Sequence, residues 1–161
     1  MKKKIDFPIY LVSLKQDIER RAKLKEHFPE SYPNFRYIDA VDGRMLSAKE
    51  YFSKAQGFFR AYNDIISPAE LGCTLSHIKV LEEFLASEKE FCLILEDDVI
   101  GTDRDIAVID RTINMLSNKS SCLFLWGMFK TPYMRYQVGK ITGSNFYLVN
   151  RFSYKYLYGT F

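Results

Sequence analysis

Short apolar runs alternate along this chain with longer segments in which apolar residues recur at helical spacing. Short runs with turn signals around them predict strands, and fully apolar ones predict strands buried on both faces. Such runs lie at residues 9–12, 35–38, 91–95 and 121–127. Helical segments are predicted over residues 17–28, from residue 68 onward and over residues 103–116. This alternation predicts an α/β fold with a doubly wound, mostly parallel sheet, in a single domain over residues 1–161.

Capping residues mark where two of the helices begin. Ser67, Pro68 and Glu70 form the pattern of a capping box with proline at the first helical position. Asp17 is expected to cap the helix that Pro29 ends. After Ser67, several apolar residues share one helical face and predict the side that packs on the core, namely Leu71, Leu75, Ile78 and Leu85.

Two regions have weaker patterns. Residues 44–66 predict only a short helix over residues 48–56, after Ser47. Residues 133–138 and 141–149 predict a hairpin that turns at Gly139 and Lys140, followed by an aromatic segment that ends at Phe161.

Composition and charge exclude several classes of protein. Hydrophobic residues make up 47% and charged residues 27%, as in ordinary globular proteins, and the net charge of +3 is too small to indicate nucleic-acid binding. No apolar run approaches the ~20 residues that a membrane span requires, so at most peripheral membrane contact is expected, through Lys2, Lys3 and Lys4. The three cysteines are odd in number and predict free thiols in a reducing compartment, the cytoplasm.

Three consecutive acids, Glu96, Asp97 and Asp98, follow the apolar run that ends at Leu95. Like charges about 4 Å apart repel by about 4 kcal/mol at an effective dielectric constant near 20. Mn²⁺ or Mg²⁺, which take oxygen ligands, would remove this cost. Ligands bind at the carboxyl ends of strands in open α/β sheets, so the acids predict a metal site, with a solvated acidic turn as the alternative. In an extended chain Glu96 and Asp98 point the same way and Asp97 the other, so Asp98 is the leading ligand candidate.

Other candidates have two interpretations each. Arg20 and Arg21 belong either to a solvated helix face or to a phosphate contact that uses the guanidinium fork. Asp42 and Gly43 form a turn, and an acid there is also placed to hold a ribose. His77 shares a helical face with Glu70 and Cys73, although most single histidines on helices are structural. Gly72 inside the same helix indicates a close approach by backbone or ligand.

The order of these motifs resembles glycosyltransferase family 25, the lipooligosaccharide-biosynthesis galactosyltransferases and their relatives. The resemblance spans residues 9 to about 150. The more specific part is the segment Glu70-Leu71-Gly72-Cys73-Thr74-Leu75-Ser76-His77 followed by Leu95-Glu96-Asp97-Asp98-Val99. The other matching segments are residues 9–14, 20–21, 40–43 and 143–148.

The resemblance implies a GT-A, Rossmann-like fold and metal-assisted transfer of galactose or glucose, with inversion, from a UDP-sugar to a lipooligosaccharide or lipopolysaccharide glycan. It also implies a place in the bacterial cytoplasm or at the inner face of the inner membrane. By motif match, Glu96, Asp97 and Asp98 take the place of the metal-binding acids, with Asp97 and Asp98 as catalytic candidates. The positions that match the donor site are Ser13, Arg20, Arg21, Asp42, Gly43, Glu70, Gly72, Ser76, His77, Gly143 and Tyr147.

Two rival functions follow from what the sequence leaves open. An inverting transfer needs a base for the acceptor hydroxyl, and no residue here can be assigned to that role. The sequence ends at Phe161, before the C-terminal portion usual in the family, so a truncated, non-catalytic nucleotide-sugar-binding remnant is the main alternative. A receiver-type phospho-acceptor domain also gathers acids around Mg²⁺, but it needs an Asp at the end of a later strand, and residues 125–127 offer none.

Overall fold

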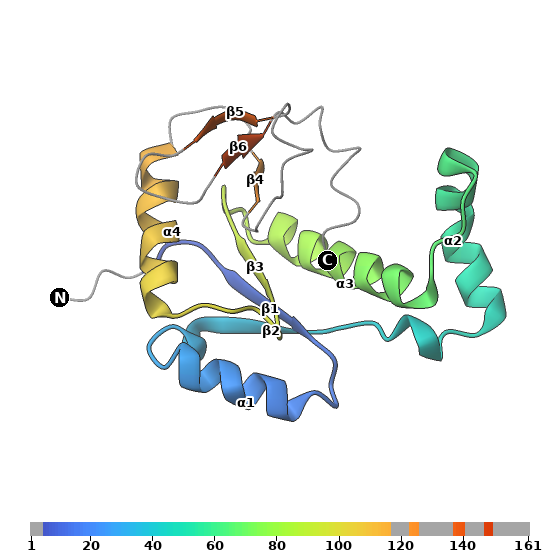
Figure 1. The fold of residues 1–161 in the computed structure, drawn as a ribbon, viewed down its shortest axis with the longest axis horizontal. Helices are drawn as coiled ribbons and strands as arrows, with labels where there is room; N and C mark the ends of the chain where they lie inside the picture. The colour runs from blue at the N-terminus through green and yellow to red at the C-terminus, as the bar shows by residue number, and fades with distance from the viewer. Residues whose placement is uncertain (1–4, 117–122, 126–136, 141–146, 150–161) are drawn as a thin grey trace. The chain divides into compact units, whose positions relative to one another are not determined.

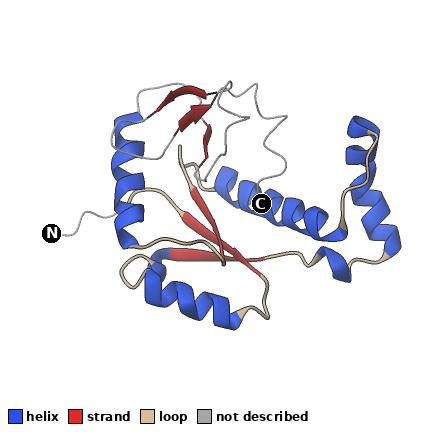
Figure 2. Ribbon diagram, in the orientation of Figure 1, coloured by secondary structure: helices blue, strands red, loops and turns tan. Residues whose placement is uncertain are grey.

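The chain forms two compact units, Met1–Ile106 and Ala107–Phe161. This computed structural model describes residues 5–116, 123–125, 137–140 and 147–149. The first unit contains strands β1 (Ile9–Ser13), β2 (Phe35–Asp39) and β3 (Leu93–Glu96), the short 3-10 helices η1 (Tyr32–Asn34) and η2 (Gly43–Met45), and helices α1 (Ile18–His27), α2 (Ala48–Tyr62) and α3 (Pro68–Ala86) (Figure 1). Helix α4 (Asp103–Leu116) starts in this unit and continues into the second. The alternation of strands and helices confirms the predicted α/β class (Figure 2).

A three-stranded parallel sheet organises the first unit, in the order β2-β1-β3. All residues of β1 are buried, as expected for a central strand that is covered on both faces. The chain places β2 on one side of β1 and β3 on the other, so the direction of winding reverses between β1 and β3. This is a topological switch point, where open α/β sheets bind ligands beyond the carboxyl ends of the strands.

The register of the sheet decides which helix each strand residue meets. Val12 pairs with Ile38 and Glu96, and the core on this face joins Tyr10 and Val12 to Val80 of α3. Leu11 pairs with Tyr37, whose ring lies under the Arg21 guanidinium of α1, 5.0 Å from the centroid. Because successive residues of a strand alternate between faces, α3 and α1 cover opposite faces of the sheet.

Helix α2 is longer than the predicted segment over residues 48–56. It runs to Tyr62 and ends at Asn63 in the left-handed conformation (φ 51°). Ser47 and Glu50 form a capping box at its start. Tyr51, Ala55 and Phe58 share one face, which packs with Ile66 and Leu71 of the next segment. This helical stripe continues past Gly57, a residue that lowers helix propensity and obscured the pattern.

The capping box at Ser67 is confirmed, but the predicted core face of α3 is only partly confirmed, because Leu71 is buried and Leu75 packs against it whereas the later members are not buried. Ile78 and Leu85 are 44% and 78% exposed, whereas Gly72, Ser76 and Val80 are buried. The buried stripe carries two small residues because the backbone of a neighbouring loop lies directly against it.

Asp17 occupies the N-cap position of α1 but makes no side-chain capping hydrogen bond. Its ψ of 51° lies outside the extended region in which an N-cap oxygen reaches the first turn. The prediction of the position was therefore confirmed and that of the capping interaction was wrong.

In the second unit, β4 (Leu123–Leu125), β6 (Tyr147–Val149) and β5 (Gln137–Lys140) form an antiparallel sheet in that order. The run at 121–127 was predicted to extend the parallel sheet, and this was wrong because β4 pairs antiparallel with β6. Gly139 and Lys140 lie in β5 opposite Leu148 and Tyr147, not in the predicted turn. Residues 150–161 lie outside the described part of the chain.

Among the described residues, no helix combines the length and the apolar character that crossing a membrane would require.

Candidate functional site

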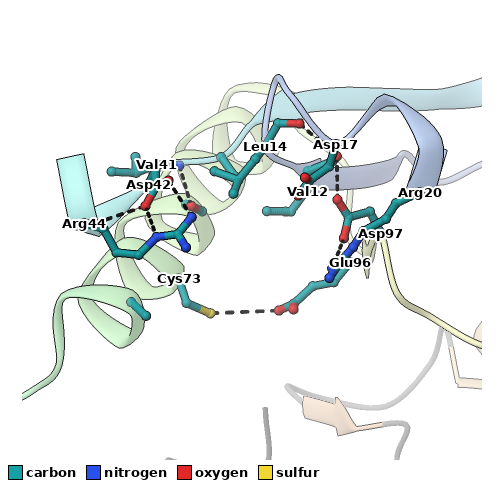
Figure 3. Close-up of a pocket in the computed structure, with 15 residues that line it drawn as sticks. Val12, Leu14, Asp17, Arg20, Val41, Asp42, Arg44, Cys73, Glu96 and Asp97 are labelled. Carbon is teal, nitrogen blue, oxygen red and sulfur yellow. Dashed lines mark hydrogen bonds and ion pairs between the residues drawn. The ribbon is translucent and has the colours of Figure 1, made fainter.

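The acids at the end of β3 separate because the strand alternates between its two covered faces. Glu96 pairs with Val12 and therefore faces α3, whereas Asp97 follows on the opposite side, toward α1. Figure 3 shows the two carboxylates diverging, with Glu96 toward Cys73 and Asp97 toward Arg20. One short sequence thus supplies two sites with different neighbours.

Asp97 is held by two hydrogen bonds at the carboxyl end of β1. Ser13 Oγ donates to its Oδ2 at 2.6 Å, and Arg20 Nη1 donates to its Oδ1 at 3.0 Å. The Asp97 side chain is only 8% exposed, whereas Arg20 is 56% exposed. The hydrogen bond and the charge of Asp97 raise the pKa of Arg20 above its ordinary value. The arginine therefore compensates a buried carboxylate and keeps an accessible guanidinium edge.

Arg21 shapes the loop that leads from β1 to α1. Its Nη1 donates to Ser13 Oγ at 2.8 Å and to the Leu14 carbonyl at 2.5 Å, and its Nη2 donates to the Lys15 carbonyl at 2.9 Å. Three acceptors and the Tyr37 ring thus engage this guanidinium. The two neighbouring arginines have different tasks: Arg20 faces the acid and Arg21 holds the loop.

Glu96 meets two side chains of α3. Its Oε1 lies 3.0 Å from His77 Nε2 and accepts a 3.9 Å hydrogen bond from Cys73 Sγ. Cys73 and His77 stand one helical turn apart on the face that turns toward β3. Contacts with Cys73 and Glu96 raise the pKa of His77 to about 9, against the opposing effect of burial. His77 is therefore a cation near neutral pH, paired with the Glu96 carboxylate.

Asp98 lies beyond the strand, in a turn that the Val99 amide closes by donating to the Glu96 carbonyl at 3.1 Å. The extended geometry that would align Asp98 with Glu96 therefore does not continue past Asp97, and that expectation was wrong. Asp98 is exposed, and within the described residues it makes no hydrogen bond or ion pair. Its carboxylate oxygens are available to a ligand.

The loop after β2 packs on the first turns of α3 without any intervening side chain. A Cβ on Gly43 would lie 1.7 Å from the Pro68 carbonyl oxygen, and one on Gly72 would lie 2.5 Å from the Val41 carbonyl oxygen. Ser76, buried beneath the loop, accepts a 2.8 Å hydrogen bond from the Val41 amide and donates to the Gly72 carbonyl at 2.7 Å. The close approach that Gly72 predicted is thus one of backbone to backbone.

We expect Ser76→Ala to lower the free energy of unfolding by about 1–3 kcal/mol, because the part-buried Val41 amide loses its acceptor. Urea denaturation measures this change. Ser53→Ala, at an exposed position of α2, is the matched control and should stay within about 0.5 kcal/mol of the parent. Equal effects of the two substitutions would contradict the role given to Ser76.

Asp42 caps η2 and forms a two-pronged ion pair with Arg44. Its Oδ1 accepts from Arg44 Nε at 2.8 Å and its Oδ2 accepts from Arg44 Nη2 at 2.7 Å. These hydrogen bonds hold the pKa of Asp42 below its ordinary value. Arg44 itself is 66% exposed and brings a second guanidinium to the rim of the site.

A pocket of about 220 Å³ opens where these groups meet (Figure 3). Four carboxylates and two guanidinium groups line it, and the His77 cation pairs with Glu96 behind its wall, so the formal charge of these groups together is −1. The charged lining residues are Asp17, Asp42, Glu96, Asp97, Arg20 and Arg44. A diphosphate would meet net repulsion there unless a cation accompanied it.

The structure gathers many, but not all, of the predicted site residues at this pocket. Those that line it are Ser13, Arg20, Asp42, Gly43, Ser76, Glu96 and Asp97. Arg21, Gly72 and His77 stand behind lining residues, and Glu70 is engaged in the capping box with Ser67. Gly143 lies outside the described residues, and Tyr147 begins β6 in the second unit. Their predicted roles at the donor remain predictions.

Among the lining residues with charged or thiol side chains, sequence reasoning missed three as site candidates, Asp17, Arg44 and Cys73. Cys73 carried a usable signal, since it precedes His77 by one helical turn. Arg44 carried a weaker one, two residues after Asp42 in a turn. Asp17 was considered only as a helix cap.

Comparisons with known proteins identify a family that covers most of the chain. The family model described as Glycosyltransferase family 25 (LPS biosynthesis protein) matches residues 6–156. A Glycosyltransferase 25 family member of Anopheles gambiae is 32% identical over 96 residues, which cover 56% of this chain and 16% of that protein. Procollagen galactosyltransferase 2 of Homo sapiens is 30% identical over 96 residues, 56% of this chain and 15% of that protein.

A third relative carries a different description. The Probable inactive glycosyltransferase 25 family member 3 of Rattus norvegicus is 30% identical over 119 residues, 70% of this chain and 21% of that protein. The matched stretches thus span about a fifth or less of the length of these relatives.

Proposed function

Since this chain belongs to glycosyltransferase family 25, we propose that it takes part in the transfer of a hexose, galactose or glucose, from a UDP-sugar to a glycan acceptor. The acceptor we propose is a lipooligosaccharide or lipopolysaccharide glycan, and the transfer proceeds with inversion. The names of the galactosyltransferase relatives support galactose, and the family description supports the acceptor class.

The observation that carries the proposal is the position of the charged pocket. It lies at the carboxyl ends of β1 and β3, on the two sides of the switch point, and Ser13, Glu96 and Asp97 line it together. Parallel α/β sheets bind nucleotides at such points. A pocket of about 220 Å³ is smaller than the roughly 300–1,000 Å³ of a complete small-molecule site, so these residues supply one part of a donor site.

The contacts of the pocket residues indicate which of them would bind the donor and which hold the loops in place. Arg20 and Arg44 present exposed guanidinium edges to an anionic donor, and each is oriented by a carboxylate partner, Asp97 or Asp42. Arg21 and Ser13 fix the loop that leads from β1 to α1, the helix that carries Arg20. Ser76 and the two glycines hold the Asp42 loop on α3.

Of the acids at the β3 tip, Asp98 is the one free to take a hard divalent cation such as Mn²⁺ or Mg²⁺, because Glu96 and Asp97 diverge and are engaged by His77 and by Ser13 and Arg20. Asp98 is exposed and free of hydrogen bonds within the described residues, and Glu96 is half-buried at the pocket wall. Oxygen donors of this kind suit both ions. When bound, the ion supplies Lewis-acid stabilisation to the departing diphosphate.

The two arginines are expected to respond differently to alanine substitution. Arg20→Ala should weaken UDP binding roughly tenfold to hundredfold, the range of a charged hydrogen bond, and should also lower stability, because the buried Asp97 carboxylate loses its cation. Arg21→Ala should lower the free energy of unfolding by about 1–2 kcal/mol, because Ser13 and two carbonyls lose their donor. Calorimetric titration with UDP and thermal unfolding measure the two effects. Equal losses of UDP affinity with unchanged stability would overturn the assignment.

The direct test of function is UDP release from UDP-galactose and UDP-glucose with Mn²⁺, with and without a lipooligosaccharide acceptor. Acceptor-dependent UDP release supports the transferase. The rat relative named as probably inactive supports a second candidate, a nucleotide-sugar-binding protein without transfer activity. Tight UDP binding without hydrolysis or transfer would favour that second function, and absence of UDP binding would overturn both.

We also propose a reducing compartment, the cytoplasm, for this protein. Cys73 and Cys92 are free thiols in the structure, and burial raises the pKa of the Cys92 thiol to about 11, which keeps it protonated. A protonated, half-buried thiol such as that of Cys92 is poorly reactive and does not require an oxidising environment.

A further inference from the structure

Three different metal-ligating side chains converge on the α3 side of β3. One ligand atom from each of Cys73, His77 and Glu96 lies within 4.8 Å of the other two, with 3.0 Å between His77 Nε2 and Glu96 Oε1 and 3.9 Å between Cys73 Sγ and Glu96 Oε1. All three residues are half-buried. Cys73 and His77 are fixed by a rigid helix, and Glu96 is fixed by the last position of a buried strand.

The ligand types distinguish this cluster from the acids beyond it. Thiolate and imidazole favour zinc and its transition-metal neighbours, whereas Mn²⁺ and Mg²⁺ favour carboxylates, carbonyls and water. Zinc sites with three protein ligands of sulfur, nitrogen and oxygen type leave a fourth position for water or a substrate. Zn–S and Zn–N distances are about 2.3 Å and 2.0–2.1 Å, so ligand atoms at the observed spacing reach one ion after movements of about an ångström.

We propose that Cys73, His77 and Glu96 form a binding site for Zn²⁺ or a similar transition-metal dication, separate from the hard-cation site proposed around Asp98. The ion forms bonds to Sγ, Nε2 and Oε1, and the protons of the thiol and the imidazolium pass to water. Glu96 lies between the two sites. When an ion is bound by Cys73 and His77, the Glu96 carboxylate is therefore no longer available as a ligand for a second ion at Asp98. The zinc site does not depend on the proposed transferase activity.

Cobalt titration tests the proposal, because Co²⁺ replaces Zn²⁺ in such sites and a Co²⁺–thiolate bond adds a near-ultraviolet charge-transfer band. The parent protein should develop the band, and excess Zn²⁺ should remove it. Cys73→Ser should lose the band, and His77→Ala should weaken Co²⁺ binding by more than the roughly 10–100-fold that an outer-shell substitution costs. The matched controls Cys92→Ser and His27→Ala should keep the charge-transfer band, and so should Asp98→Asn.

The absence of a charge-transfer band in the parent protein would overturn the proposal, and so would a band that survives in Cys73→Ser. Loss of the band in Asp98→Asn would also overturn it, since the ion would then belong to the acidic tip. Because UDP binding is measured separately, failure here leaves the transferase proposal intact.

A second measurement needs no variant. Zn²⁺ should slow alkylation of Cys73 in the parent protein at least about tenfold, as followed by peptide mass spectrometry, because the metal-bound thiolate is occupied. Labelling of Cys92 provides the reference within the same molecule and should not change. Equal labelling of Cys73 with and without Zn²⁺ would contradict the site even if a substituted chain failed to fold.

Discussion

Replacing Asp98 with asparagine is expected to abolish the Mn²⁺-dependent part of UDP binding while the fold stays intact. The Asp98 carboxylate is exposed and makes no hydrogen bond within the described residues, so its loss removes a ligand and no structural contact. Loss of a direct ligand should cost at least the roughly 100-fold upper range known for outer-shell partners of metals. Calorimetric titration with UDP at fixed Mn²⁺, beside a thermal unfolding curve, measures both quantities.

The control for this substitution is Asp6→Asn, which removes another exposed carboxylate, one that pairs with Lys89 at the surface. Surface pairs of this kind contribute little, so UDP affinity and stability should match those of the parent. Unchanged manganese dependence in Asp98→Asn would show that Asp98 is not a metal ligand.

Replacing Gly43 with alanine is expected to destabilise the protein strongly, because the added methyl group would overlap with backbone atoms of α3. The added Cβ would lie 1.7 Å from the Pro68 carbonyl oxygen and 2.8 Å from the Gly72 amide nitrogen, both backbone atoms that cannot rotate away. Overpacking of this kind costs typically 1–3 kcal/mol and occasionally more, and a backbone clash belongs at the upper end. Because the loop also carries Asp42 and Arg44, UDP affinity should fall together with stability.

Gly57→Ala provides the matched comparison, because nothing lies within 4 Å of a Cβ built there. Gly57 is inside α2, so alanine should stabilise the protein by about 0.5–1 kcal/mol through helix propensity. Urea denaturation of both variants gives opposite signs if the loop packs on α3 as described. A neutral Gly43→Ala would refute that packing.

The sequence predicted well those features of the fold that depend on interactions between residues close together in the chain. Helix α4 has the predicted bounds, and Ser67 with Glu70 forms the predicted capping box, since both depend on residues a few positions apart. The core face of α3 was predicted from hydrophobicity alone and missed Gly72 and Ser76, whose value lies in being small. An apolar run such as residues 123–125 predicts a strand but carries no information about its partner, hence the wrong sheet for β4.

The sequence predicted the acidic residues of the candidate site better than it predicted the roles of the arginines and of Cys73. Strand alternation correctly separated Glu96 from Asp97, but it could not foresee that the chain turns before Asp98. The different roles of Arg20 and Arg21 depend on which carbonyls the β1–α1 loop presents, and spacing does not encode that. Cys73 belongs to the site because β3 places Glu96 beside α3, a contact between distant parts of the chain that the sequence pattern does not reveal.

Titration of the parent protein with UDP, once with Mn²⁺ and once with a chelator, tests most directly whether a cation at the β3 tip lets this pocket hold a diphosphate. The four carboxylates and two arginines of the pocket lining predict binding with Mn²⁺ and a loss of at least about 100-fold without it. UDP binding of equal strength in the presence of the chelator would contradict the account.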